Sequence, residues 1–497
     1  MKYVQSLARL GAGFALAAMV LAAGASGAQE TPEVITKQYE DGCIYEGTFK
    51  EGLQHGQGTY RLPNGYEYSG EWVMGEIRGQ GVARFPNGSV YEGQFENGRP
   101  HGAGKITYAD GGSYEGAWVE GRIEGQGRAS YANGVSYEGS FLDGAHNGKG
   151  VMESPGGYRY EGDWAAGVKE GTGKITYPDG SVYEGQMRGG ERAGEGRLSM
   201  PDGLVYEGQW AAGQINGDGK LTQPNGDIYT GRFVNGRREG IGRVDYANGD
   251  TYEGEFRADR RHGRGIFRSA EGYVYEGDWA DGQMSGTGSA TYPDGSVYEG
   301  EFVAGQAEGA GIITYGDGSS YEGAWMGGVM EGRGTARYAG GMVYEGEFRG
   351  GRNHGQGTMT AADGYRYEGG WRDGLREGHG VATYADGTVY KGSFAAGLRE
   401  GEGEITMPGG FRYSGAWKAG EMHGHGTATY ATGDVYEGSF VNGQRDGQGT
   451  MRYATGQVIS GDWSGGDLSA SGNPDGLQAA PPDEAPPQET PPAEGGK

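Results

Sequence analysis

Aromatic residues and glycines recur along this chain with a period of 23 residues. A tyrosine stands at position 45 and at every twenty-third position up to Tyr436, and Ile459 takes the nineteenth and last of these lead positions. No insertion or deletion interrupts the frame between residues 45 and 463. A fold that tolerates variable loops would have drifted in length, so the repeat predicts that neighbouring copies place each residue.

Within each copy, apolar and polar positions alternate with the period of two that is typical of β-strands. The segments 91–95 and 102–108 both follow this pattern, and the first of them places its aromatic residues on one face. Gly98 marks a turn between the two segments, while Asp110-Gly111 resembles a three-residue hairpin loop with glycine at the left-handed position. The pattern therefore predicts one β-hairpin in each copy.

The residues that flank the second turn test this register. Positions 17 and 21 after each lead position should face each other across the hairpin. In 16 of the 18 complete copies one of the two is aromatic and never both: Tyr108 accompanies Gly112, and the order is reversed where Ser154 precedes Tyr158. Tyr39 fits the same rule ahead of the first copy, so we expect the array to begin with a half-repeat near Val34.

Two further repeat positions supply the predicted core. The position four residues after each lead position holds all nine tryptophans, and phenylalanine fills the other copies apart from Met187. Gly-x-Gly pairs such as Gly171 and Gly173 are expected to leave room for rings from adjacent strands. We predict that the structural core of the repeat includes Tyr45, Tyr68, Tyr91, Tyr114, Tyr137, Tyr160, Trp72, Trp118, Trp164, Trp210, Trp279, Trp325, Trp371, Trp417 and Trp463.

These patterns predict an all-β fold, an extended single-layer antiparallel ribbon of tandem hairpins. Strands about 4.8 Å apart, two to a copy, would make a rod roughly 180 Å long and some 20 Å wide. Composition agrees, because glycine supplies 110 residues and only 35% of the chain is hydrophobic, which leaves little for a conventional core.

The two ends of the chain differ from the array. Residues 1–28 have a basic start, an apolar run and small residues before a predicted cleavage between Ala28 and Gln29, as in a secretory signal peptide. An uncleaved anchor is the alternative. Residues 29–33 are a short linker, 34–463 the repeat array, and 464–497 an acidic, proline-rich tail that we expect to be disordered. The chain is therefore expected to be exported, to the periplasm or the cell exterior.

Charge and cysteine content restrict the partners. The formal net charge is −25, which disfavours nucleic acid and anionic lipid surfaces but would attract cationic proteins and, diffusely, divalent cations. Cys43 is the only cysteine, so no internal disulfide can form. We expect it to pack into the first hairpin, and the alternative is a bridge between two chains.

The unit resembles the MORN repeat (membrane occupation and recognition nexus). The resemblance covers residues 45–463 and rests on Tyr-Glu-Gly-x-Phe/Trp, a glycine, His-Gly-x-Gly and Asp-Gly, as in the segments 344–348 and 354–357. It implies an extended β-sheet array that acts as a scaffold, a dimer mediator or a membrane-associated tether. Some members belong to lipid kinases, but this chain has no kinase domain, and its acidity argues against the phospholipid association of the family.

No constellation of residues predicts a catalytic, cofactor or metal site. His55, His101, His262, His354 and His423 share one repeat position next to a turn, roughly 19 Å apart at the nearest, which is too far to share one ion. The segment 171–175 lacks the first glycine and the Ser/Thr of a phosphate-binding loop. Glutamate follows the lead position in 14 of 19 copies, which predicts a solvated acidic row rather than a pair of catalytic carboxylates.

The sequence thus favours a non-enzymatic exported scaffold that binds a protein partner or itself. Open end strands would allow self-association. The alternative is a module that binds surface polysaccharide or lipid headgroups through its aromatic rings. If the tryptophans are core residues, their replacement should unfold the protein instead of weakening such binding.

Overall fold

The computed structural model describes residues 33–469, in which every regular element is a β-strand. The chain divides into two units, with the division between Val168 and Lys169. The predicted signal peptide with its cleavage site at Ala28 and Gln29, almost all of the linker, and the tail from residue 470 onward lie outside the described residues.

The first unit contains β1 (Ile35–Gln38), β2 (Ile44–Lys50), β3 (Leu53–Arg61), β4 (Glu67–Val73), β5 (Glu76–Arg84), β6 (Val90–Glu96), β7 (Arg99–Thr107), β8 (Ser113–Val119), β9 (Arg122–Ser130), β10 (Ser136–Leu142), β11 (Ala145–Glu153) and β12 (Arg159–Ala165).

The second unit contains β13 (Val168–Thr176), which begins at the boundary, β14 (Val182–Arg188), β15 (Glu191–Ser199), β16 (Val205–Ala211), β17 (Gln214–Thr222), β18 (Ile228–Val234), β19 (Arg237–Asp245), β20 (Thr251–Arg257), β21 (Arg260–Arg268), β22 (Val274–Ala280), β23 (Gln283–Thr291), β24 (Val297–Val303), β25 (Gln306–Thr314), β26 (Ser320–Met326), β27 (Val329–Arg337), β28 (Val343–Arg349), β29 (Arg352–Thr360), β30 (Arg366–Arg372), β31 (Leu375–Thr383), β32 (Val389–Ala395), β33 (Leu398–Thr406), β34 (Arg412–Lys418), β35 (Glu421–Thr429), β36 (Val435–Val441), β37 (Gln444–Arg452), β38 (Val458–Ser464) and β39 (Asp467–Leu468).

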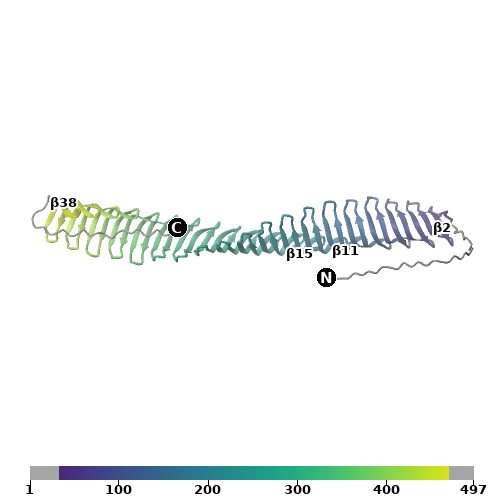
Figure 1. Cartoon of the computed structure of the whole chain (residues 1–497), viewed down its shortest axis with the longest axis horizontal. Coiled ribbons are helices and arrows are strands. Elements are labelled where there is room, and N and C mark those ends of the chain that lie inside the picture. The colour runs from purple at the N-terminus through teal and green to yellow at the C-terminus, as the bar shows by residue number, and fades with distance from the viewer. Residues whose placement is uncertain (1–32, 470–497) are drawn as a thin grey trace, which may run out of the picture. The chain divides into compact units, whose positions relative to one another are not determined.

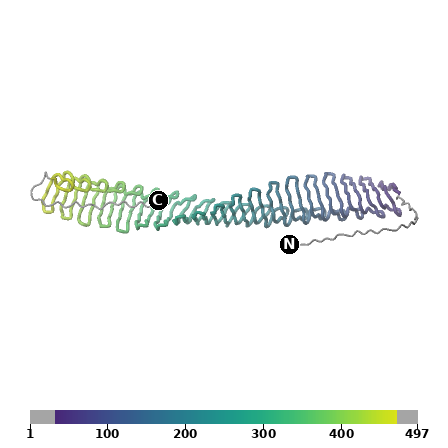
Figure 2. Tube along the Cα trace, viewed as in Figure 1, coloured from purple at the N-terminus to yellow at the C-terminus, as the bar shows by residue number. Residues whose placement is uncertain are grey.

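Within each unit, every strand pairs antiparallel with the next strand in the sequence. The pairing runs from β1 to β12 in the first unit and from β13 to β39 in the second. Figure 1 shows β2 and β11 in the first unit and β15 and β38 in the second, and Figure 2 traces the hairpins one after another. The prediction of an all-β fold built from tandem antiparallel hairpins is confirmed.

The register places the lead tyrosines as the alternation predicts. Tyr91 pairs with Ile106 and Gly93 with Gly104, so one face carries the ring and the two glycines beside it. The next hairpin repeats the arrangement, with Ile106 opposite Tyr114.

The loop that follows each second strand also matches its prediction. The amide of Tyr108 donates to the carbonyl of Gly112 at 2.8 Å, which encloses a three-residue loop, and Gly111 has a φ of +90°. The Asp110 carboxylate accepts the amide of Gly112 at 2.9 Å. Positions 17 and 21 therefore do face each other across the turn.

The first glycine of each Gly-x-Gly pair has a different role from the predicted one. Gly93 pairs with Gly104 and Phe95 with Pro100, so β7 accommodates two extra residues as a bulge. Gly102 lies in this bulge with a φ of +71°, and a Cβ atom there would meet the side chain of Gln94 rather than a ring. Gly171, with a φ of +80°, is equivalent. Only the second glycine makes room for an aromatic ring, because the left-handed backbone turns the first one away.

The ends of the described array are short strands. β1 is exposed along its whole length and pairs only with β2, while β39 pairs with β38 through Trp463 and Leu468. The predicted boundary at residue 463 therefore divides this last hairpin, because the Gly465-Gly466 turn returns the chain onto β38. Cys43 is a free, buried thiol at the first turn.

Candidate binding surface

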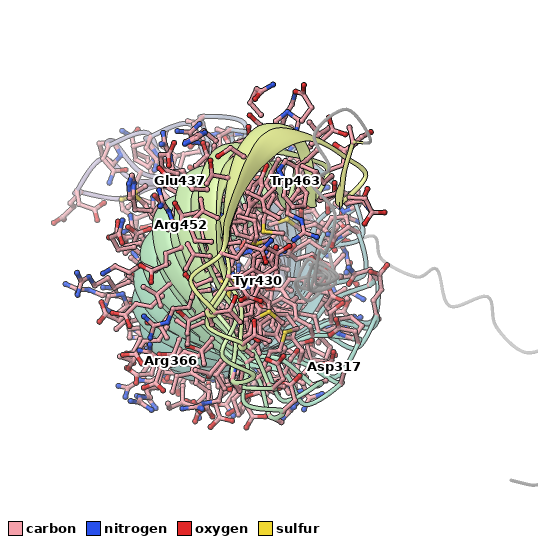
Figure 3. All side chains as sticks on the ribbon, turned by 90° about the vertical axis from the view of Figure 1, so that its left-hand side faces the viewer. Asp317, Arg366, Tyr430, Glu437, Arg452 and Trp463 are labelled. Atoms are coloured by element: carbon pink, nitrogen blue, oxygen red, sulfur yellow. The ribbon has the colours of Figure 1, made fainter. Side chains whose placement is uncertain are left out.

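The strands present two different faces. One face, which we call the ring face, carries the lead tyrosines and the tryptophans or phenylalanines four residues after them. The other, the charged face, carries the residue after each lead tyrosine and the residues that pair with it. Figure 3 shows the contrast near the end of the second unit, with Trp463 and Tyr430 on one side of the ribbon and Glu437 and Arg452 on the other.

Glutamates on the charged face are open to solvent. The side chains of Glu115 and Glu253 are 71% and 70% exposed, even though Lys105 and Arg243 reach them at 3.7 and 4.0 Å. Shorter contacts link Lys174 to Glu184 at 2.6 Å and Arg197 to Glu207 at 3.0 Å. Exposed pairs of this kind stabilise a fold by at most about 1 kcal/mol each. The charged face therefore remains available to an external partner.

The ring face is packed instead. The six predicted core tyrosines from Tyr45 to Tyr160 are at most 1% exposed, and the nine tryptophans are 2–8% exposed. Except where Met187 replaces a ring, each lead tyrosine meets the ring of the next hairpin edge-to-face: the centroids of Tyr91 and Trp118 lie 5.0 Å apart, and those of Tyr390 and Trp417 lie 5.2 Å apart. Such T-shaped pairs are favourable beyond the apolar area that they bury.

The glycine beneath each lead tyrosine explains this packing. A Cβ atom on Gly58 would lie 2.3 Å from the hydroxyl oxygen and 2.5 Å from the ring of Tyr45. The indole Nε1 of Trp72 also donates to the Gly58 carbonyl at 3.2 Å. The ring of one strand thus lies on the backbone of the next, and the tryptophan of the following hairpin holds that backbone in place.

The lead hydroxyls are buried donors. Tyr91 donates to the carbonyl of Gln94 at 2.9 Å, and Tyr114 donates to that of Ala117 at 2.9 Å. Burial raises the pKa of both phenols to about 12. They stay protonated below that pH and satisfy a carbonyl inside the layer.

Sequence reasoning missed the position nine residues after each lead tyrosine, which we call the slot. Its side chain lies on the ring face and contacts the ring of the next hairpin. Arg192 places its guanidinium carbon 4.2 Å from the centroid of Trp210, and Arg445 lies 4.9 Å from that of Trp463. Both donate from Nη2 to the carbonyl of a turn glycine, Gly213 or Gly466, at 2.7 Å. The alternation of the strand places the slot on the ring face, but it does not reveal that the slot residue contacts the ring 18 residues later.

One slot holds a histidine. His146 stacks on Tyr137 with 3.6 Å between centroids and an interplanar angle of 12°, and its Nε2 lies 2.6 Å from the hydroxyl of Tyr131. Burial lowers the pKa of His146 to about 4. This imidazole is a neutral packing element at physiological pH, because its charged form would lose hydration.

The five histidines that share a repeat position lie next to turns, as predicted. The Nδ1 atoms of His55 and His101 accept the amides of Met74 and Glu120 in the next hairpin at 3.4 and 3.5 Å. Carboxylates do the same in other copies, as where Glu308 accepts the amide of Gly327 at 2.8 Å. Histidine and glutamate together fill 12 of the 18 copies of this position, and both can offer an acceptor to the following turn.

Residues 33–469 contain no group of three or more His, Cys, Asp or Glu side chains arranged to hold a metal ion. The same residues include no helix long and apolar enough to cross a membrane. The segment 171–175 lies within β13 and forms part of a strand.

Comparison with curated proteins finds short matches to Alsin. Rat Alsin is 41% identical over 58 residues, which are 11% of this chain and 4% of Alsin, and human Alsin is 40% identical over 58 residues with the same coverage. The match thus spans a small fraction of the length of these relatives.

Solved structures give low overall similarity. The TCP domain of Drosophila melanogaster SAS-4, in complex with a proline-rich motif of Ana2, is 20% identical with a TM-score of 0.22, covering 31% of this chain and 85% of that one. The TCP10 domain of Danio rerio CPAP, in complex with a STIL peptide, is 14% identical with a TM-score of 0.19, covering 54% and 94%. These scores are too low to indicate a shared function.

The family comparison covers most of the array. The model of the MORN repeat matches residues 45–65, 68–90, 91–113, 114–136, 137–157, 160–182, 183–205, 206–228, 229–251, 252–272, 275–297, 298–320, 321–343, 344–364, 367–389, 390–412, 413–435 and 436–458. These matches coincide with the 18 complete copies of the 23-residue unit. The chain belongs to the MORN repeat family.

Proposed function

We propose that the protein is a non-enzymatic scaffold that binds a cationic protein partner along its charged face. The observation that carries this proposal is the row of open glutamates on one face, present in 14 of the 19 copies, while the other face is buried packing. A repeated acidic surface recruits positively charged partners and fixes their position along the array. The net charge of −25 also attracts positively charged partners.

Export is a second part of the proposal. It rests on the composition of residues 1–28 alone. Amino-terminal sequencing of the protein isolated from the periplasm or culture medium should begin at Gln29. A chain recovered from the cytoplasm with Met1 intact would contradict export.

The aromatic alternative has less support. A ring that stacks on a sugar must offer an open face, and the tryptophans of the array are at most 8% exposed. Glycan arrays with the purified protein would test it. Saturable binding that survives replacement of the charged-face glutamates would favour a polysaccharide ligand over a protein.

Crosslinking in the native compartment, followed by pull-down, tests protein binding. Glu276, Glu299 and Glu322 are exposed on the charged face of three successive hairpins. Replacing all three by lysine should abolish capture of a cationic partner.

The matched control replaces Glu51, Glu120 and Asp143 by lysine. These three side chains lie at turns, so the net charge changes equally while the charged face stays intact. Equal loss of capture by both variants would show that only net charge matters and would contradict a defined surface.

A further inference from the structure

One slot of the array lacks a side chain long enough to reach the next ring. Ala307 stands where the other complete copies carry a larger residue. A cavity of about 390 Å³ opens at this point, and its lining includes Tyr292, Tyr298, Trp325 and Gly328. Its volume falls within the range of small-ligand sites. The rim is open, since Tyr292 and Val329 are 36% and 43% exposed.

We call the cavity at Ala307, with its tyrosine and tryptophan walls, the box. Other copies of the repeat show which side chain fills the equivalent space. Five repeats before Ala307, Arg192 occupies the slot, with its guanidinium carbon 4.2 Å from the centroid of Trp210 and 5.8 Å from that of Tyr183. Its Nη2 donates to the carbonyl of Gly213 at 2.7 Å. Tyr183, Trp210 and Gly213 contact Arg192, and the residues at the same repeat positions five copies later, Tyr298, Trp325 and Gly328, line the cavity at Ala307. All three are identical in type to their counterparts, and Tyr292 in the cavity wall likewise corresponds to Tyr177.

A second slot arginine, Arg445, shows that a tyrosine next to the turn can accept a hydrogen bond from the guanidinium. Arg445 lies six repeats after Ala307 and donates from Nη1 to the hydroxyl of Tyr430 at 3.3 Å and from Nη2 to the carbonyl of Gly466 at 2.7 Å. Tyr292 and Gly328 are the equivalents of these two acceptors and both line the cavity. The box at Ala307 thus repeats the aromatic walls and the acceptors of a guanidinium site.

The residues found in the other slots indicate whether the box suits a cationic or an apolar side chain. Nine slots face a tryptophan of the next hairpin, and they hold Gln54, Pro100, His146, Arg192, Arg261, Ala307, Asn353, Arg399 and Arg445. None of these is isoleucine or methionine, which fill six of the nine slots that face phenylalanine or methionine. Indole is the strongest aromatic partner of a cation. Arginine fills four of the nine tryptophan-facing slots and two of the other nine, so a slot that faces tryptophan favours a guanidinium.

From these observations we infer that the box at Ala307 binds the guanidinium of an arginine side chain contributed by a partner protein. The indole of Trp325 and the phenol of Tyr298 supply the walls, and the Gly328 carbonyl and Tyr292 hydroxyl accept its hydrogen bonds. The acidic chain attracts a basic segment, and the box anchors one residue of it. This deepens the proposed scaffold function, on which it rests for the identity of the ligand as a protein.

The test uses the full chain labelled with 5-fluorotryptophan and followed by fluorine NMR. Trp325→Phe assigns the Trp325 resonance. The probe is a capped Gly-Arg-Gly peptide at constant ionic strength, and its neutral isostere contains citrulline. We expect the Trp325 resonance to shift saturably with the arginine peptide, the citrulline peptide to bind at least tenfold more weakly, and the Trp210 resonance to stay unchanged.

Two variants provide reciprocal controls. Ala307→Arg should place a guanidinium in the box and abolish the response of Trp325, whereas Arg192→Ala should empty an equivalent box and give Trp210 a response to the same peptide. The Arg192→Ala result keeps the inference testable if Ala307→Arg fails to fold.

The inference is overturned if the arginine peptide does not shift the Trp325 resonance, or if the citrulline peptide shifts it equally. Tighter binding of free arginine than of the peptide would assign the box to an amino acid and overturn the assignment to a protein partner. These outcomes are separable from the crosslinking result, because the box is titrated with a defined peptide and the charged-face glutamates are left intact.

Discussion

At the scale of single residues, the lead tyrosine combines three functions. Its ring covers the glycine of the next strand, its edge meets a tryptophan or phenylalanine, and its hydroxyl donates to a carbonyl three residues later. At Tyr367, which is fully buried, this carbonyl belongs to Gly370 at 2.9 Å. The one aliphatic residue in this series, Ile459, stands at the last lead position.

Removing one lead hydroxyl should therefore lower stability measurably. We expect Tyr367→Phe to reduce the free energy of unfolding by about 1–2 kcal/mol, because the buried Gly370 carbonyl loses its donor. The urea midpoint measured by tryptophan fluorescence checks this. Tyr108→Phe is the control, since that ring is 38% exposed and its change should stay within about 0.5 kcal/mol.

His146 should make stability depend on pH below neutrality. Its pKa in the folded protein, about 4, is lower than the ordinary value of 6.5, so the unfolded chain binds the extra proton between these values. Stability must then fall as the pH drops from about 6.5 towards 4. The melting temperature of the wild type should fall more steeply in this window than that of His146→Asn, and parallel curves would contradict the assignment.

At the scale of the hairpin, the two glycines of each Gly-x-Gly pair serve different purposes. The first adopts a left-handed φ within a bulge, and the second allows a tyrosine ring to lie on the backbone. The sequence alone predicts a ring-accommodating role for both, because strict alternation places them on the same face. The bulge breaks that equivalence, and its position depends on the pairing of two strands.

Substitution of the second glycine should be the more damaging change. A methyl group on Gly58 would overlap the ring of Tyr45, and neither the ring nor the backbone has room to move. We expect Gly58→Ala to unfold the first hairpins, with a loss of at least about 3 kcal/mol.

Gly52→Ala is the matched control in the same hairpin. Nothing lies within 4 Å of its added methyl group, and only its φ of +77° opposes the change. We expect a loss of about 1 kcal/mol there. Circular dichroism during thermal unfolding would compare the two, and equal losses would contradict the packing argument.

At the scale of the whole molecule, stability is a sum of similar contacts between neighbouring hairpins. Burial raises the pKa of Tyr91, Tyr114 and Tyr183 to about 12, so the folded protein holds protons that the unfolded chain releases above its ordinary value of 10. Linkage then lowers stability as the pH rises from about 10 to 12. Repetition multiplies this effect along the array.

We therefore expect a cooperative alkaline transition that begins near pH 10. Phenolate absorbance at 295 nm and the β-sheet circular dichroism signal should change together, because buried lead tyrosines ionise only as hairpins open. Phenolate formation for all tyrosines near pH 10 with unchanged circular dichroism would contradict their burial.

Within residues 33–469, the first strand of the array has an edge that pairs with no other strand. Val34 and Ile35 are 63% and 46% exposed beside β1, which pairs only with β2. Such edges can pair with a second chain. We expect light scattering to show an oligomer at high concentration that Ile35→Pro disrupts, and a monomer at all concentrations would exclude association through this edge. The sequence estimate of roughly 180 Å for the length of the array is a separate prediction for solution scattering.

The sequence by itself determined the period, the strand alternation, the turn pairs and the family, because each is a local pattern repeated in one frame. Only the tertiary structure revealed the bulge at Gly102, the guanidinium of Arg192 on Trp210, the turn acceptors at the histidine position and the open box at Ala307. The bulge lies within one hairpin, whereas the contacts of Arg192 and of the histidines join residues 18 to 21 positions apart on adjacent hairpins. Their existence depends on a register that the pairing of strands sets, and no alternation within one strand encodes it.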